Sequence, residues 1–250
     1  MSTLLLRIAA PMQSWGASSR FKKLSTEREP TKSGIIGLVA SALGRDRGED
    51  VSDLTALLFG VRVDQPGELL RDYHTAHNPN NNKLAFISER YYLCDAVFVV
   101  GLESDNDLLL VEIETALQSP RFPLYLGRRS CPPSGKIVLG ISNLQLREAL
   151  SEQEWQAQAW LMRRRIKEKR VNLEIIIDAP NDSNRSYIKR DIPVTFNQEH
   201  RIYGFRSISS DLAGVTVNNP LCSASDDTLK EDYLEEHQTE HDPFLNLGGE

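Results

Sequence analysis

The residues best suited to chemistry lie at 121–134, a segment that reads RFPLYLGRRSCPPS. Its prolines fix φ and remove backbone donors, whereas Gly127 permits a positive φ or the close approach of another chain segment. A rigid, shaped loop is therefore predicted. Arg128, Arg129 and the Ser130 hydroxyl, together with the local amides, provide the donors that phosphate oxygens accept. Gly-Arg-Arg also occurs in ordinary solvated turns, so the rest of the chain must decide between the two interpretations.

A second candidate is the loop at residues 12–32, which is too long and too basic to be a simple connection. Trp15 lies beside Gly16 in this loop, where its ring could stack on a base or plug the end of a sheet. The loop carries five cations: Arg20, Lys22, Lys23, Arg28 and Lys32.

The segment 33–43 is predicted to be an amphipathic helix, with Ser33 as its N-cap and Gly44 just beyond its end. Gly34 and Gly37 are unfavourable inside a helix, by about 1 kcal/mol each relative to alanine. Either an anion bound at the helix start or close packing on the sheet would require them.

The elements that position these loops follow the order strand, helix, strand, strand, helix, strand, which is that of the ferredoxin-like fold. The predicted ranges are 4–9, 33–43, 61–64, 96–102, 108–118 and 137–140, with a further short helix at 52–59. We therefore expect an α+β protein whose first domain, residues 1–145, is ferredoxin-like (RRM-like).

Residues 68–93 interrupt this order and are predicted to form an inserted β-hairpin, or thumb. Its centre, NPNNNK, offers no apolar surface to bury, and its flanks alternate as strands do. The thumb mixes cations with aromatic faces, as single-stranded nucleic-acid binders do, although an ordinary solvated hairpin can look the same. These residues are Arg71, Tyr73, His74, His77, Lys83, Arg90, Tyr91 and Tyr92.

The second half predicts a small β-rich subdomain at residues 146–220, with strands at 173–177 and 201–206. The pattern Ser151 to Glu154 is typical of a capping box and predicts a helix with Trp155, Ala159 and Met162 on one face. That helix would end in RRRIKEKR, whose six cations could form a solvated face or an RNA contact.

The net charge of −6 is unevenly distributed. Residues 221–250 hold nine acidic residues against Lys230 alone, so the rest of the chain carries +2. This tail is predicted to be disordered, and His237 and His241 lack a third ligand for a metal. Three widely spaced cysteines indicate reduced thiols, and no cofactor is expected. The first apolar run is too short for a signal or a membrane span, so we expect a cytoplasmic protein that does not contact a membrane.

Four segments resemble the CasD-type subunits of the type I-E CRISPR Cascade complex. They occur in family order and cover most of residues 4–135, and the last is the most specific. The segments are LRIAAPMQSWG, PTKSGIIGLVASALG, LRDYHT…YYLCDAVF and PLYLGRRSCPPS.

The resemblance implies a repeat-associated RNA-binding domain that caps the 5′ handle of the guide RNA. It also implies assembly with the CasC backbone subunit and the CasA large subunit, and contact with target DNA through the whole complex. The RNA-binding residues expected on this basis are Gln13, Ser14, Trp15, Arg20, Arg28, Lys32, Ser33, Gly34, Arg71, Tyr73, His74, Arg90, Tyr91, Gly127, Arg128, Arg129, Ser130 and Cys131.

A non-catalytic RNA-binding subunit is therefore the preferred hypothesis. The alternative is a metal-independent endoribonuclease that processes precursor CRISPR RNA, in which His74, Tyr73 and Arg71 would supply the base and the cation. A scaffolding protein without RNA contact is a third possibility, which the clustered arginines make less attractive.

Overall fold

A computed structural model describes residues 1–16, 23–78, 81–179, 186–197 and 201–223. Its main feature is a seven-stranded antiparallel sheet in the order β10-β11-β9-β4-β7-β1-β8. The strands are β1 (Ser2–Ala9), β4 (Leu58–Gln65), β7 (Val97–Ser104), β8 (Val138–Ser142), β9 (Arg170–Asp178), β10 (Ser186–Thr195) and β11 (Ile202–Asn218).

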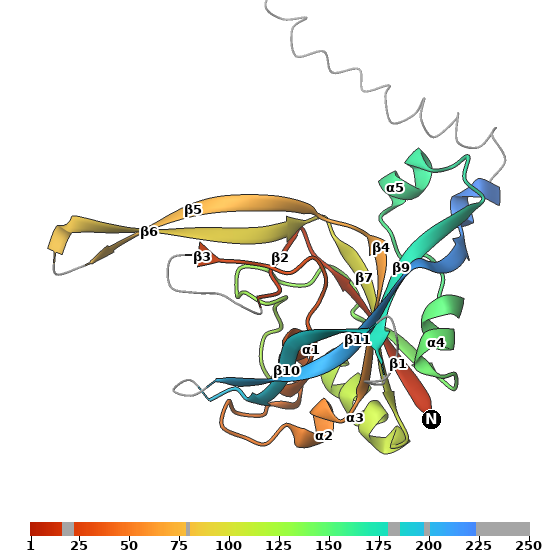
Figure 1. Cartoon of the computed structure of the whole chain (residues 1–250), viewed down its shortest axis with the longest axis horizontal. Coiled ribbons are helices and arrows are strands. Elements are labelled where there is room, and N and C mark those ends of the chain that lie inside the picture. Colours follow the sequence, from red (N-terminus) through yellow and green to blue (C-terminus); the bar gives the residue numbers. More distant parts are fainter. Residues whose placement is uncertain (17–22, 79–80, 180–185, 198–200, 224–250) are drawn as a thin grey trace, which may run out of the picture.

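The predicted ferredoxin-like fold is confirmed by the strand order β8-β1-β7-β4 within this sheet. Helices α1 (Lys32–Leu43) and α3 (Asp107–Gln118) cover one face, and α4 (Leu146–Glu152) covers the other (Figure 1). Because successive side chains of a strand point to opposite faces, β1 serves both cores. Leu4 and Leu6 are fully buried in the larger core on the α1 side, whereas Leu5 packs with Leu146 beneath α4.

The predicted thumb is a long β-hairpin that projects from the body of the molecule (Figure 1). It consists of β5 (Glu68–Asn78) and β6 (Asn81–Cys94), paired in register from Glu68 opposite Cys94 to His77 opposite Ala85. At its base, β6 also pairs with β2 (Met12–Gln13) and β3 (Lys23–Leu24). The first loop is thereby attached to the thumb.

The strands of the second half continue the first sheet, because β9 pairs with β4. Within residues 146–220 the remaining elements are α5 (Ala159–Arg164) and the start of a 3-10 helix, η1 (Pro220–Ser223). The predicted boundary between two domains at residue 145 stays a prediction, because one sheet contains strands from both sides of it.

The helix predicted from the capping-box pattern forms only in part, because Ala159 to Arg164 are helical (α5) whereas residues 153–158 are not. Glu152 is the last residue of α4, and residues 153–158 run alongside β4 instead of continuing a helix. The indole of Trp155 donates to the Asp64 carbonyl at 2.8 Å, and the Gln156 amide donates to the Asp64 carboxylate at 2.6 Å. Buried Arg62, itself paired with Asp64, donates to the carbonyls of Gln153 and Glu154 and to that of Leu150 in α4. Contacts with β4 thus satisfy the groups that helical hydrogen bonds would otherwise use.

Two smaller expectations also need correction. The helix α2 (Ser52–Thr55) is shorter than predicted, because Phe59 is buried in β4. The N-cap of α1 is Thr31 rather than Ser33, since the Thr31 hydroxyl accepts the Gly34 amide. The predicted C-cap is confirmed, with Gly44 at φ 80°.

Some expectations fall outside the described residues. They concern Arg20, Lys22, Pro79 and Asn80 of the NPNNNK centre, and the acidic tail from residue 224 onward with its two histidines. Of the helices in the described part of the chain, none has the length and apolar character to cross a membrane.

Candidate nucleic-acid interface

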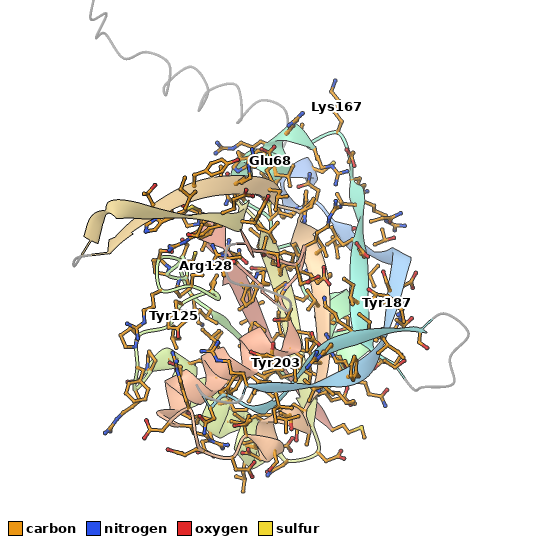
Figure 2. All side chains as sticks on the ribbon, turned by 60° about the vertical axis from the view of Figure 1, so that its left-hand side comes forward. Glu68, Tyr125, Arg128, Lys167, Tyr187 and Tyr203 are labelled. Carbon is orange, nitrogen blue, oxygen red and sulfur yellow. The ribbon has the colours of Figure 1, made fainter. Side chains whose placement is uncertain are left out.

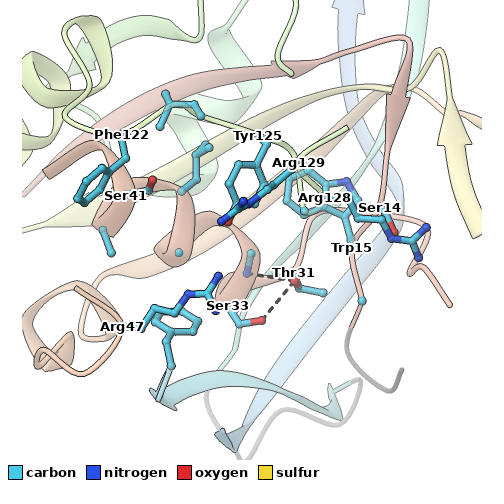
Figure 3. A pocket seen from close by; sticks show the side chains of 18 of the residues that line it. Ser14, Trp15, Thr31, Ser33, Ser41, Arg47, Phe122, Tyr125, Arg128 and Arg129 are labelled. Atoms are coloured by element: carbon cyan, nitrogen blue, oxygen red, sulfur yellow. Dashed lines mark hydrogen bonds between the residues drawn. The ribbon is translucent and has the colours of Figure 1, made fainter. Parts of the chain in front are cut away.

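An open groove of about 1160 Å³ lies between the 121–132 loop, helix α1 and the approach to β11 (Figure 3). It brings together three segments that the sequence singled out: Ser14 to Gly16, Thr31 to Gly34, and Gly127 to Arg129. The charged residues of its wall are five arginines against one aspartate. They are Arg45, Arg47, Arg128, Arg129, Arg201 and Asp46. Such a surface favours a polyanion.

Gly127 fixes the loop against the first segment. Its φ is 85°, and a Cβ built there would lie 1.6 Å from the carbonyl oxygen of Ser14. The Ser14 amide donates to the Leu126 carbonyl at 3.1 Å, and the Leu126 amide donates to Cys131 at 2.8 Å. The glycine is therefore required by contact between two backbones, as well as by its dihedral angle.

The two adjacent arginines have different environments. Arg128 is half-buried: its Nη2 donates to the Leu24 carbonyl at 2.8 Å, and its guanidinium lies 4.4 Å from the centroid of the Tyr92 ring. Its Nη1 is buried and has no hydrogen-bond partner among the described residues. Arg129 and Ser130 are exposed. Arg128 thus attaches the loop to β3 and β6 and retains one free donor, whereas Arg129 faces the solvent of the groove.

Of the two roles predicted for Trp15, stacking on a base or plugging the end of the sheet, the structure shows the second. Trp15 is 1 % exposed, and its indole donates to the Gln13 amide oxygen at 3.1 Å. Gln13 is also buried and donates to the Ala96 carbonyl. A Cβ on Gly34 would lie 2.8 Å from the Trp15 ring, so that glycine is explained by packing rather than by an anion.

The start of α1 is occupied by a carboxylate of the protein itself. The backbone amide of Lys32 donates to the Asp191 carboxylate at 3.0 Å. The buried side-chain ammonium of Lys32 donates to the Leu57 carbonyl at 2.7 Å and to the Asp178 carboxylate at 3.1 Å. Arg206 pairs with both Asp178 and Asp191. The helix N-terminus and the Lys32 ammonium, which we expected to face RNA, are therefore engaged inside the fold.

Three other expected contacts are also buried. Ser14 donates to the Tyr91 carbonyl at 3.2 Å, and Ser33 lies by the Thr31 hydroxyl at 3.4 Å. Cys131 is 1 % exposed in the larger core, and burial raises the pKa of its thiol. Their side chains position the loops and offer little surface to a ligand.

The predicted thumb residues lie away from the groove wall. Arg71, Tyr73 and His74 are exposed on β5, and the Arg71 guanidinium lies 4.9 Å from the Tyr73 ring centroid. On β6, Tyr91 donates to Glu89 at 3.1 Å, and Arg90 is half-buried with an Nε that has no partner in the described part of the chain. Arg28 is exposed and does not line the groove either.

Several residues of the groove were missed in the sequence. Figure 2 shows Tyr125 and Arg128 between the thumb and Tyr203 of β11. Exposed or half-buried aromatic rings beside cations are surfaces on which bases stack. The missed residues are Arg45, Arg47, Phe122, Tyr125, Phe196, Arg201 and Tyr203. The stretch FNQEHRIYGF, which mixes aromatic and basic residues at 196–205, was the available signal.

Not every arginine of the wall is equally available. Arg45 forms a two-pronged ion pair with Asp53, with N–O distances of 2.6 and 2.5 Å, and that hydrogen bond raises its pKa. Arg47, Arg129 and Arg201 are exposed, and Figure 3 shows the first two on the groove wall. These three guanidinium groups are therefore the strongest candidates for phosphate contacts.

Comparison with known proteins identifies the family of the chain. Residues 3–209 match the model of the family described as CRISPR-associated protein (Cas_Cas5). The chain belongs to this family. It is 38 % identical over 159 residues to the CRISPR system Cascade subunit CasD of Escherichia coli (strain K12), an alignment that covers 56 % of this chain and 70 % of that protein.

Two solved structures share the fold over almost the whole described chain. One, a CRISPR RNA-guided surveillance complex, contains a chain that superposes with a TM-score of 0.71 at 29 % identity, covering 88 % of this chain and 92 % of that one. The other, a Cas protein, gives a TM-score of 0.65 at 36 % identity and covers 87 % and 95 %.

Proposed function

We propose that this chain is a non-catalytic subunit of a Cascade-type CRISPR complex and holds the 5′ handle of the guide RNA in its groove. The observation that carries the proposal is the convergence of Arg47, Arg129 and Arg201 with aromatic rings on one open wall. Its relatives support the assembly, since one is named a Cascade subunit and another belongs to an RNA-guided surveillance complex.

In this proposal the phosphates of the handle contact the three exposed guanidinium groups. Tyr125 and Tyr203 provide faces on which unpaired bases stack. The thumb, with its exposed Arg71 and Tyr73, separates the handle from the bases that pair with target DNA. CasC and CasA are the expected neighbours in the assembly.

The experiment is a guide-RNA copurification from cells that express the whole operon. Replacing Arg47, Arg129 and Arg201 with glutamine should reduce the RNA recovered per complex at least about tenfold at 0.2 M salt, and should lower the salt slope by about 2, since each single-strand phosphate contact contributes about 0.7. The matched control replaces Arg163, Arg164 and Arg170, which are exposed and lie off the groove, and should leave RNA retention unchanged. Equal retention by both triple variants would remove the groove from the RNA site.

The endoribonuclease alternative gives a different expectation. Arg71 and Tyr73 share one face of β5, as their ring contact shows, whereas the side chain of His74 leaves from the opposite face. The three groups therefore do not converge on one reacting atom. We expect His74→Ala to leave the cleavage of precursor RNA unchanged, measured on gels with the dedicated processing subunit CasE present. Cleavage by the purified chain that His74→Ala abolishes would establish the nuclease instead.

A further inference from the structure

A second basic surface lies well away from the groove, on α5 and the turn that leads into β9. We name it the basic shoulder; its members are Arg163, Arg164, Arg165, Lys167, Lys169 and Arg170. Only Arg165 of the six forms an ion pair within the described chain, with Glu168 at 3.2 Å. The other five are exposed, and Figure 2 shows Lys167 at the top of the molecule, with Tyr203 of the groove in its lower half.

The end of the described chain is fastened to this shoulder. The side-chain amide of Asn219 donates to the carbonyls of Met162 at 3.1 Å and Arg165 at 2.9 Å, and its backbone amide donates to Lys169 at 3.1 Å. Asn219 is 3 % exposed, so these contacts are part of the core beneath α5. Ser223, which ends η1, therefore leaves the fold beside the cations.

The sequence that follows is strongly acidic, with nine carboxylates against Lys230. Asp226 and Asp227 come three and four residues after Ser223. Because a residue spans at most about 3.6 Å, these carboxylates are held within roughly 11 to 14 Å of the last described residue. Chain connectivity alone thus places the first acidic residues near the shoulder at a high effective concentration.

We propose that residues 224–250 dock by charge on the basic shoulder and cover it until a competing polyanion displaces them. Opposite charge, the point of departure and the short distance to Asp226 all favour this occupant. The groove is a less favourable site for the tail, because Arg128 of its wall lies beneath the thumb, well apart from Lys167 (Figure 2). The docking is independent of the proposed RNA function and depends on salt, since exposed charges are screened beyond about 8 Å at physiological ionic strength.

Zero-length carbodiimide coupling tests the contact directly, because it joins a carboxylate only to a lysine amine that touches it. In the purified full chain, mass spectrometry should find cross-links from residues 226–236 to Lys167 or Lys169, and these should disappear at 1 M salt. Mixing isotope-labelled and unlabelled chains should show that each cross-link joins residues of one molecule. Cross-links to Lys136 instead, cross-links between molecules, or their absence would each overturn the proposal.

Competition supplies the second measurement. Truncation after Ser223 should raise the affinity for a 20-base-pair DNA duplex about fivefold or more at 50 mM salt, as should replacement of the nine tail acids by their amides. Replacing Arg163, Arg164, Lys167 and Lys169 with glutamine should abolish this difference between the full and truncated chains. An unchanged DNA affinity on truncation, or a gain that survives these four substitutions, would show that the tail does not cover the shoulder.

Discussion

Replacing Arg206 with methionine is expected to destabilise the protein by about 3–5 kcal/mol, the usual cost of breaking a buried ion network from one side. Arg206 is 8 % exposed. Its Nε lies 2.6 Å from one oxygen of Asp191 and its Nη2 lies 2.9 Å from the other, and its Nη1 pairs with Asp178. Without it, buried Asp191 would keep no ion-pair partner in the described part of the chain, and half-buried Asp178 would keep only the Lys32 ammonium.

The loss of stability is expected to be large because this network joins the two halves of the chain. Asp178 also accepts the Phe59 amide of β4 at 3.1 Å, and Asp191 accepts the first amide of α1. We therefore expect urea unfolding to show a lower midpoint. Arg190→Met, on the exposed side of β10, is the control and should change stability by no more than about 0.5 kcal/mol.

A second substitution separates charge from packing. Adding Asp191→Asn to Arg206→Met removes one uncompensated carboxylate, so part of the lost stability should return. A double variant that is less stable than Arg206→Met by the full cost of Asp191→Asn alone would mean that the two groups act independently. That result would contradict the network.

Local pattern predicted much of the fold. The ferredoxin-like order, the thumb and the end of α1 at Gly44 all follow from periodicity and turn chemistry over a few neighbouring residues. The helix predicted from Ser151 is interrupted at residues 153–158, because backbone groups of this stretch find partners in Arg62 and Asp64 of β4, about 90 residues earlier. No short-range pattern encodes that competition.

The candidate site also depends on long-range contacts that short-range sequence patterns do not encode. Lys32 looks like one more cation of a basic loop, yet its partners Asp178 and Asp191 are 146 and 159 residues away. Tertiary pairing therefore decides which cations remain exposed. Arg201 and Tyr203 reach the groove only because β11 pairs with the edge strand β10, which packs against α1. Gly127 was identified correctly, since a glycine between a rigid proline-rich segment and two arginines already indicated a special backbone position.

Gly127→Ala should be the most disruptive single-methyl change in the groove. A side chain at φ 85° costs about 1 kcal/mol by itself. The added Cβ would also fall 1.6 Å from the Ser14 carbonyl oxygen, a distance that no rotamer can relieve because the backbone fixes the positions of both atoms. We expect a total loss of about 3 kcal/mol or more, measured as a lower urea midpoint and a lower Tm.

Alanine substitutions at two other glycines separate the two causes of this loss of stability, the positive φ and the steric clash. Gly135 has φ 74°, and a Cβ there would come no closer than 3.8 Å to Arg7, so Gly135→Ala should show the dihedral cost of about 1 kcal/mol alone. Gly48 has open space around it, and Gly48→Ala should be nearly neutral. Equal losses at Gly127 and Gly135 would mean that the contact with Ser14 is not a constraint.

The same variant connects the fold to the proposed RNA site. The contact between Gly127 and Ser14 sets the position of Arg128 and Arg129, because the loop can relieve the clash only by moving away from the first segment. Gly127→Ala should therefore lower guide-RNA retention although every cation of the groove is still present. At a temperature where both variants remain folded, Gly135→Ala should retain the RNA. RNA retention by Gly127→Ala equal to wild type would show that the loop geometry does not position the phosphate contacts.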